Sequence, residues 1–170
     1  MDFKDKIRII EDFPETGVSF KDITTLLKDK DAFKGALMSM ANSLRDRDID
    51  LIAGPEARGF IVGAPLAYEL DVGFVPARKR GKLPAKTIET EYKLEYGTDT
   101  LQMHEDAILP GQKVVIADDL LATGGTIASI IKLVEGLGGI ITGIIFLIEL
   151  SDLKGREILG DYDVISLIKY

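Results

Sequence analysis

The segment from Val114 to Thr126 combines a buried-strand pattern, two acids and a glycine pair, and it limits the possible folds of this chain more than any other stretch. Val114–Ala117 is an unbroken apolar run with the length and β-branched content of a strand buried on both faces. Asp118 and Asp119 follow where such a strand ends, and a short loop leads into a helical pattern from Ile127 to Leu137. A buried strand, a loop and a helix form the unit of α/β folds with parallel sheets, so the segment predicts that fold class.

The loop after the two acids has the composition of an anion-binding turn. A glycine pair flanked by threonines allows successive backbone N–H groups to face one anion at a helix N-terminus. Asp118 and Asp119 would repel a bound phosphate unless they face hydroxyl groups or a metal ion. A 5-phosphoribosyl group meets both conditions, because it carries a phosphate at one end and a vicinal diol close by. The predicted ribose-phosphate site consists of Asp118, Asp119, Ala122, Thr123, Gly124, Gly125 and Thr126.

Two other phosphate-binding patterns are absent from the sequence. Neither the Walker pattern G-x-x-x-x-G-K-[ST] nor the dinucleotide pattern G-x-G-x-x-G occurs in the 170 residues. The remaining alternative is purely structural: a tight strand-to-helix turn in which an aspartate caps the helix.

Composition and charge limit the function classes further. The balance of Lys+Arg 21 against Asp+Glu 28 gives 21 − 28 = −7, which argues against a nucleic-acid-binding or anionic-membrane surface. The absence of cysteine excludes disulfides, thiolate nucleophiles and cysteine-ligated zinc, and the single His104 excludes a histidine metal cluster. The N-terminus lacks a signal-peptide core, and the longest apolar run, Ile140–Ile148, is shorter than the ~20 residues of a membrane span. We expect one domain covering residues 1–170, located in the cytoplasm.

Hydrophobic periodicity along the rest of the chain predicts a mainly parallel sheet of about five strands covered by helices. Besides the central segment, strands are expected at 51–53, 73–77, 140–148 and 162–168, and helices at 3–13, 29–47, 60–70 and 153–159. Aromatic and charged residues alternate in 87–100, which predicts a β-arm against which Leu101 and Met103 return past Gly97. The charged, weakly apolar character of this arm suits a lid better than a core.

Several segments resemble the type I phosphoribosyltransferases, and in particular those members that use adenine. Residues 114–126 are similar to the phosphoribosyl-diphosphate signature of the family, 17–22 to its G-V-x-F-[RK]-D segment, 78–84 to R-K-R-G-K-L-P and 94–97 to L-E-Y-G. The similarity extends over nearly the whole chain. It implies the α/β fold of that family with an N-terminal purine-binding hood (about residues 1–30) and a flexible β-arm (about residues 79–103). The implied reaction is adenine plus 5-phospho-α-D-ribosyl diphosphate giving AMP and diphosphate, a step of purine salvage.

The resemblance also implies an adenine site. Phe20 would stack on the purine, and the backbone of Ser19 and Lys21 would bind it. Leu150 would cover the other purine face, and Arg58 would lie at the pocket for the base. From the residues alone, Phe20 could equally belong to a small satellite core.

The same resemblance assigns the diphosphate site to cationic side chains. A cis peptide bond is expected between Glu56 and Ala57, in the loop that precedes Arg58. The cationic run at 78–82 is unusual in an acidic protein, although a solvated surface is the alternative. The implied diphosphate-binding residues are Arg58, Arg78, Lys79 and Lys82.

The implied catalytic residues are Glu95, which would handle the proton of the base, and Tyr96, which would support closure of the arm. A carboxylate is a suitable base here, because the chain has no cysteine and one histidine. Mg²⁺ is expected to bind through the diphosphate and ribose of the donor, without a direct protein ligand. The resemblance further implies a homodimer. Two rivals remain open: an enzyme of the same fold acting on a 6-oxopurine, and a purine-responsive regulator without turnover.

Overall fold

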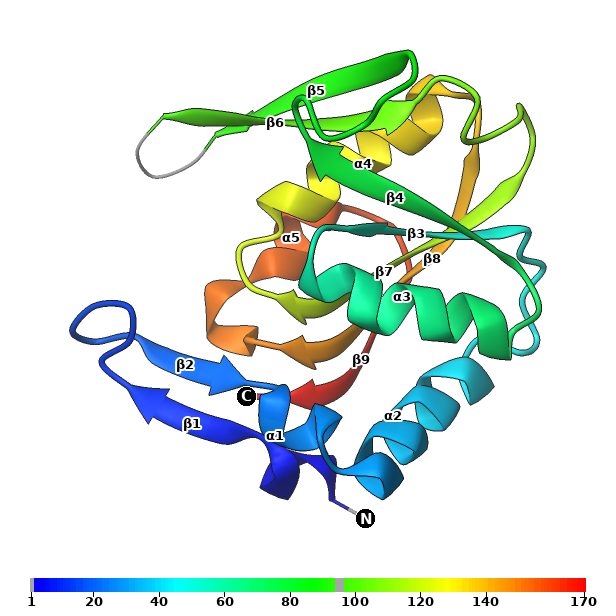
Figure 1. The fold of residues 1–170 in the computed structure, drawn as a ribbon. Helices are drawn as coiled ribbons and strands as arrows, with labels where there is room; N and C mark the ends of the chain where they lie inside the picture. Colours follow the sequence, from blue (N-terminus) through cyan, green and yellow to red (C-terminus); the bar gives the residue numbers. More distant parts are fainter. Residues whose placement is uncertain (1, 94–96) are drawn as a thin grey trace.

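The computed structural model describes residues 2–93 and 97–170. Within those ranges the chain folds around a seven-stranded sheet in the order β5-β6-β4-β3-β7-β8-β9 (Figure 1). The strands β4, β3, β7, β8 and β9 run parallel to one another. The β5–β6 hairpin joins β4 in antiparallel orientation. The predicted α/β fold with about five parallel strands is therefore confirmed. The strand bounds are β3 Leu51–Pro55, β4 Gly73–Lys79, β5 Thr87–Lys93, β6 Thr98–His104, β7 Lys113–Leu121, β8 Ile140–Glu149 and β9 Val164–Lys169.

Helices cover both faces of the sheet, and the central strand β7 explains why. Val115 and Ala117 pack with the helices on one face, whereas Val114 and Ile116 pack on the other, and all four are fully buried. Such a strand buries two faces at once, which requires the unbroken apolar run that the sequence contains. The helices are α2 (Lys30–Asn42) and α3 (Arg58–Glu69) on the first face, and α4 (Gly125–Gly136) and α5 (Gly155–Leu159) on the second.

The hood differs from its prediction. The expected helix over residues 3–13 is wrong: only the 3-10 turn Phe3–Lys6 is helical, and β1 (Arg8–Glu11) pairs with β2 (Ser19–Asp22) as an antiparallel hairpin. Two hydrogen bonds from the Arg8 guanidinium to the Asp22 carboxylate close the hairpin. The backbone N–H of Thr24, followed by Arg8, lowers the pKa of Asp22 to about 2. Cross-strand pairing has thus overridden the helical spacing of the apolar residues.

The arm is built from β5 and β6, and its base belongs to the core. Leu101 and Met103 return past Gly97 as predicted, but both are fully buried, and Ile88 packs with them above α4. The expectation that the arm would suit a lid rather than a core therefore fails at its base. Gly97 has a φ of +98°, a conformation that glycine adopts without steric cost.

Smaller differences concern the ends of elements. The helix α2 stops at Asn42 rather than at 47, and the predicted helix over 153–159 consists of a 3-10 turn Ser151–Leu153 and then α5. A short helix α1 (Thr24–Leu27) follows the hood. No helix in the described ranges is long and apolar enough to cross a membrane. The hood and the arm both project on the side toward which the parallel strands run, at left in Figure 1.

Candidate active site

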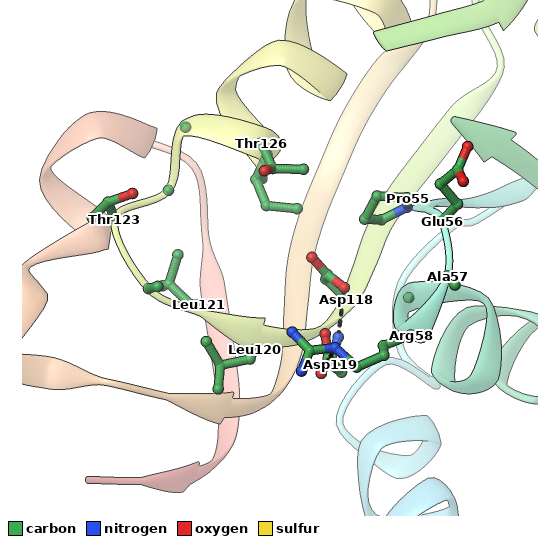
Figure 2. A pocket seen from close by; sticks show the side chains of 15 residues that line it. Pro55, Glu56, Ala57, Arg58, Asp118, Asp119, Leu120, Leu121, Thr123 and Thr126 are labelled. Carbon is green, nitrogen blue, oxygen red and sulfur yellow. Dashed lines mark hydrogen bonds and ion pairs between the residues drawn. The ribbon is translucent and has the colours of Figure 1, made fainter. Parts of the chain in front are cut away.

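A cavity of about 270 Å³ lies at the carboxyl ends of β3 and β7, where ligands collect in open parallel sheets. Figure 2 shows its lining side chains, with the two acids of β7 next to Arg58 and the threonines of the following loop across the hollow. Two loops form the walls: residues 55–59 after β3 and residues 118–127 from the end of β7 into α4. Every residue of the predicted ribose-phosphate site lines this cavity.

The loop between β7 and α4 presents an uncapped helix N-terminus to the cavity. Gly124 occupies the N-cap position with φ +87°, and no side chain caps the helix. A Cβ on Gly124 would lie 2.7 Å from the carbonyl oxygen of Gly155, so the loop packs directly on the start of α5. A Cβ on Gly125 would meet no atom within 4 Å. The first N–H groups of a helix lack partners within the helix, so this end can bind an anion.

The two acids lie within β7, before its last two residues, and not after the strand as predicted. Asp118 is 8% exposed and Asp119 is 3% exposed. The Oδ1 atom of Asp118 accepts a hydrogen bond from the backbone N–H of Asp119 at 2.8 Å. Neither carboxylate caps α4, so the alternative of a purely structural helix cap is wrong. Burial, followed by the charge of Asp119, raises the pKa of Asp118 well above its usual value.

Arg58 is the cation nearest the acid pair. Its Nε atom lies 3.0 Å from Oδ2 of Asp119, in an ion pair without the alignment of a hydrogen bond. The side chain of Arg58 is 48% exposed and its Cζ lies 5.8 Å from the ring centroid of Phe20. Arg58 therefore connects the acid pair to the hood.

The loop before Arg58 contains the predicted cis peptide bond between Glu56 and Ala57, which is confirmed. Glu56 Oε1 accepts a hydrogen bond from the backbone N–H of Lys79 at 2.8 Å and lies 3.3 Å from Nε of Arg78. A Cβ on Gly59 would lie 2.9 Å from Oδ1 of Asp118, so this loop packs closely on the acids.

The four predicted diphosphate residues are not all gathered in the cavity. Arg58 lines it, whereas Arg78, Lys79 and Lys82 are not among its described lining residues. Arg78 forms an ion pair with Glu56, which lines the cavity. Lys79 Nζ pairs with Asp99 of the arm at 3.1 Å. Lys82 is exposed to solvent, and its carbonyl oxygen accepts a hydrogen bond from Arg78.

Three of the five predicted adenine residues line a second hollow of about 390 Å³ beneath the hood. Ser19, Lys21 and Leu150 line it together with Tyr170. Phe20 is not among the described residues that line this hollow. Its ring packs edge-on against Phe13, faces Arg58 and is partly exposed. The predicted catalytic residues Glu95 and Tyr96 lie outside the described residues.

The sequence predicted no site role for three residues that the fold brings to these sites. Glu56 and Asp99 each pair with a predicted diphosphate cation, and Tyr170 lies under the hood. Glu56 had a local signal, because it precedes Arg58 in the loop after β3. The Lys79–Asp99 pair had none, because it depends on how β6 pairs with β4. In the described part of the chain, no group of three His, Cys, Asp or Glu side chains is arranged to hold a metal ion.

Residues 24–169 match the phosphoribosyl transferase domain, and the chain therefore belongs to the phosphoribosyltransferase family. Over its full length it is 62% identical to the adenine phosphoribosyltransferase of Clostridium tetani and 57% identical to that of Clostridium acetobutylicum, covering 99% of each. Within the family, the chain thus belongs with the adenine phosphoribosyltransferases.

Solved structures agree with this placement. The adenine phosphoribosyltransferase of Thermoanaerobacter pseudethanolicus is 62% identical, with a TM-score of 0.97 over 99% of this chain and 98% of that one. The enzyme of Saccharomyces cerevisiae, complexed with adenine and an imino-altritol bisphosphate, is 36% identical with a TM-score of 0.92, over 98% of this chain and 96% of that one.

Proposed function

We propose that this chain transfers the 5-phosphoribosyl group from 5-phospho-α-D-ribosyl diphosphate to N9 of adenine, giving AMP and diphosphate in purine salvage. The observation that carries the proposal is the buried acid pair beside an uncapped helix N-terminus in one cavity. A phosphate and a nearby vicinal diol on one sugar fit these two features. The names of the full-length relatives support adenine as the base.

The phosphate of the donor binds the backbone N–H groups of residues 122–126. The ribose hydroxyls donate hydrogen bonds to Asp118 and Asp119, which replaces the water that these carboxylates lose on burial. As the bond to diphosphate breaks, positive charge develops at C1′ of the sugar. Two carboxylates fixed beside that centre stabilise it without having to reorganise.

The leaving diphosphate binds the cations Arg58, Arg78, Lys79 and Lys82. Arg58, Arg78 and Lys79 each lie next to a carboxylate in the structure, at 3.0 to 3.3 Å from Asp119, Glu56 and Asp99. Donor binding therefore exchanges protein carboxylates for the phosphate oxygens. Mg²⁺ would be held by oxygens of the donor rather than by protein side chains, and it would neutralise part of the diphosphate charge.

Adenine binds between the hood and Leu150, with the backbone of Ser19 and Lys21 at its edge and Phe20 and Arg58 beside it.

Glu95 accepts the N9 proton and Tyr96 supports closure of the arm; both roles are proposals from the resemblance alone. The substitution Glu95→Gln should lower kcat more than it changes KM, the pattern of an interaction made in the transition state. Activity within a few-fold of the wild type would exclude Glu95 as the base.

Release of diphosphate tests the function directly. The purified protein is supplied with phosphoribosyl diphosphate, Mg²⁺ and one of adenine, hypoxanthine or xanthine. Turnover with adenine but not with the 6-oxopurines supports the proposal, and turnover with only a 6-oxopurine favours the rival enzyme. Binding without turnover favours a regulator.

We also propose that residues 1–170 act as one domain and that the enzyme is a homodimer. Sedimentation analysis checks the dimer.

A further inference from the structure

The second hollow connects the hood to the end of β9 through one aromatic side chain. Tyr170 follows β9, and the Nζ atom of Lys21 in β2 lies 4.7 Å from the centroid of its ring. Lys4 lies against the same ring, with Nζ 4.4 Å from the centroid, and donates to the backbone oxygen of Lys169. Ammonium groups at these distances are attracted electrostatically to an aromatic ring. The ring of Tyr170 therefore attaches two parts of the hood to the sheet.

The backbone of Tyr170 holds the opposite wall of the hollow. Its N–H donates to the carbonyl oxygen of Glu149 at 2.9 Å, and the N–H of Ser151 donates to the main-chain oxygen of Tyr170 at 2.8 Å. These two hydrogen bonds lie on either side of Leu150, which lines the hollow. Both walls, Lys21 on the hood and Leu150 on the sheet, are thus connected through the same residue.

The hydroxyl group of Tyr170 takes no part in these contacts. Its oxygen is buried and has no hydrogen-bond partner among residues 2–93 and 97–170. Burial raises the pKa of the phenol, so the group stays neutral. A buried hydroxyl without a partner destabilises a fold, so the aromatic ring, rather than the hydroxyl, accounts for the contact with Lys21.

We propose that Tyr170 is a positioning residue for adenine, because it sets the separation between the hood backbone at Ser19–Lys21 and the side chain of Leu150. The inference rests on the proposed function and adds a residue that acts on the base alone. Tyr170 is not among the described residues that line the ribose-phosphate cavity, so its removal should leave the donor site intact.

Steady-state kinetics of two variants test this role. Tyr170→Leu should raise KM for adenine about two- to tenfold, the range expected when a cation–π contact is lost, and leave KM for phosphoribosyl diphosphate unchanged. Tyr170→Phe keeps the ring and should hold KM for adenine within about twofold of the wild type. Tyr162→Leu is the matched control: Tyr162 lies before the other end of β9, bonded to Glu135, and its removal should leave KM for adenine unchanged.

A change on the hood tests the same contact without altering the sheet. Lys21→Met keeps the hood backbone and should raise KM for adenine by a similar factor. The contact between Lys21 and Tyr170 is lost in each single variant, and Tyr170→Leu also loses the contact with Lys4. KM for adenine in the double variant should therefore be no higher than in Tyr170→Leu alone. The proposal is overturned if both KM values rise together in Tyr170→Leu, if the Phe and Leu variants behave alike, or if KM for adenine does not change.

Hydrogen exchange separates this inference from the proposed function. If the wild type releases no diphosphate with adenine, the proposed function fails, yet exchange in Ser19–Asp22 still reports on the Tyr170 contact. These backbone amides should exchange faster in Tyr170→Leu than in the wild type or in Tyr170→Phe. Equal exchange in the three proteins would refute the link between Tyr170 and the hood.

Discussion

At the scale of single residues, Asp118 is an acid whose burial destabilises the fold when the carboxylate is charged. It is almost fully buried and adjoins a second carboxylate, and both conditions disfavour its charged form. Groups with pKa values shifted in this way concentrate at functional sites, where a ligand supplies the missing partners. The acid pair therefore has a functional explanation and no evident structural one.

The substitution Asp118→Asn should stabilise the protein without ligand and weaken donor binding. Since the pKa of Asp118 is raised above 3.8, the stability that its protonated form contributes is fully present below pH 3.8. That stability is lost as the pH rises through the raised pKa. Removing the charge should add about 1 kcal/mol or more to the free energy of unfolding at pH 7. Urea unfolding at pH 7 and pH 4 checks this, because the gain should shrink at the lower pH. A variant less stable than the wild type at pH 7 would contradict it.

At the scale of elements, the two glycines that begin α4 have separate requirements. Gly124 has φ +87°, and a Cβ there would lie 2.7 Å from a backbone oxygen of Gly155, whereas a Cβ on Gly125 would lie in open space. The fold of the loop thus requires Gly124, whereas Gly125 leaves open the space in which the proposed phosphate binds.

Alanine at each position separates the two effects. Gly124→Ala should destabilise the protein by about 2 kcal/mol or more, because neither the φ angle nor the backbone contact can adjust easily. Gly125→Ala should fold with unchanged or slightly higher stability but raise KM for phosphoribosyl diphosphate, because its methyl group enters the phosphate site. Thermal unfolding and donor kinetics check the pair. Equal stability of the two variants would contradict the structure.

A partly buried ion pair joins β8 to α5. Arg156 donates to both carboxylate oxygens of Glu149 at 2.7 Å, and to the backbone oxygen of Val164. This pairing lowers the pKa of Glu149 from 4.5 to about 2. The stability that Glu149 contributes is therefore present above pH 4.5 and is lost as the pH falls toward 2.

Glu149→Gln should lower the free energy of unfolding by about 2 kcal/mol at pH 7. This is less than the full pKa shift of Glu149 implies, because Arg156 is partly exposed to solvent. The deficit should narrow between pH 4.5 and pH 2 as the wild-type carboxylate becomes protonated. Glu157→Gln is the matched control, since Glu157 is 74% exposed and its Lys154 partner is 4.0 Å away. Urea unfolding across this pH range measures both variants. A pH-independent deficit would refute the linkage.

At the scale of the whole molecule, the arm holds a cation that the proposed function assigns to the diphosphate. Lys79 at the end of β4 pairs with Asp99 of β6, and the hydroxyl of Tyr92 in β5 donates to the same carboxylate at 3.2 Å. If Lys79 binds the diphosphate as proposed, donor binding must break this pair. The arm and the donor would then compete for one ammonium group.

Asp99→Asn should tighten donor binding about two- to fivefold, because a partly exposed ion pair is worth up to roughly 1 kcal/mol. Calorimetric titration with phosphoribosyl diphosphate measures the change. Glu89→Gln removes the same charge from the arm but breaks a pair with Arg80, so it should leave donor affinity unchanged. Equal effects of the two substitutions would show that net charge, rather than the release of Lys79, is responsible.

The sequence alone determined the features that are contiguous in the chain. The buried strand over 114–117 and the glycine loop before α4 were predicted correctly, because burial on both faces requires an unbroken apolar run. The end of the strand was wrong, since β7 continues to Leu121 and contains both acids. The five parallel strands follow from the same logic of alternating buried strands and helices.

Only the tertiary structure decided which distant residues meet. The spacing of apolar residues in 3–13 fits a helix, but pairing with β2 makes 8–11 a strand, since hydrogen bonds between strands do not depend on that spacing. The contacts of Arg58 with Asp119, Lys79 with Asp99 and Tyr170 with Lys21 join segments whose separation is set by strand order and register. Local periodicity carries no information on either quantity, because both result from the packing of the complete sheet.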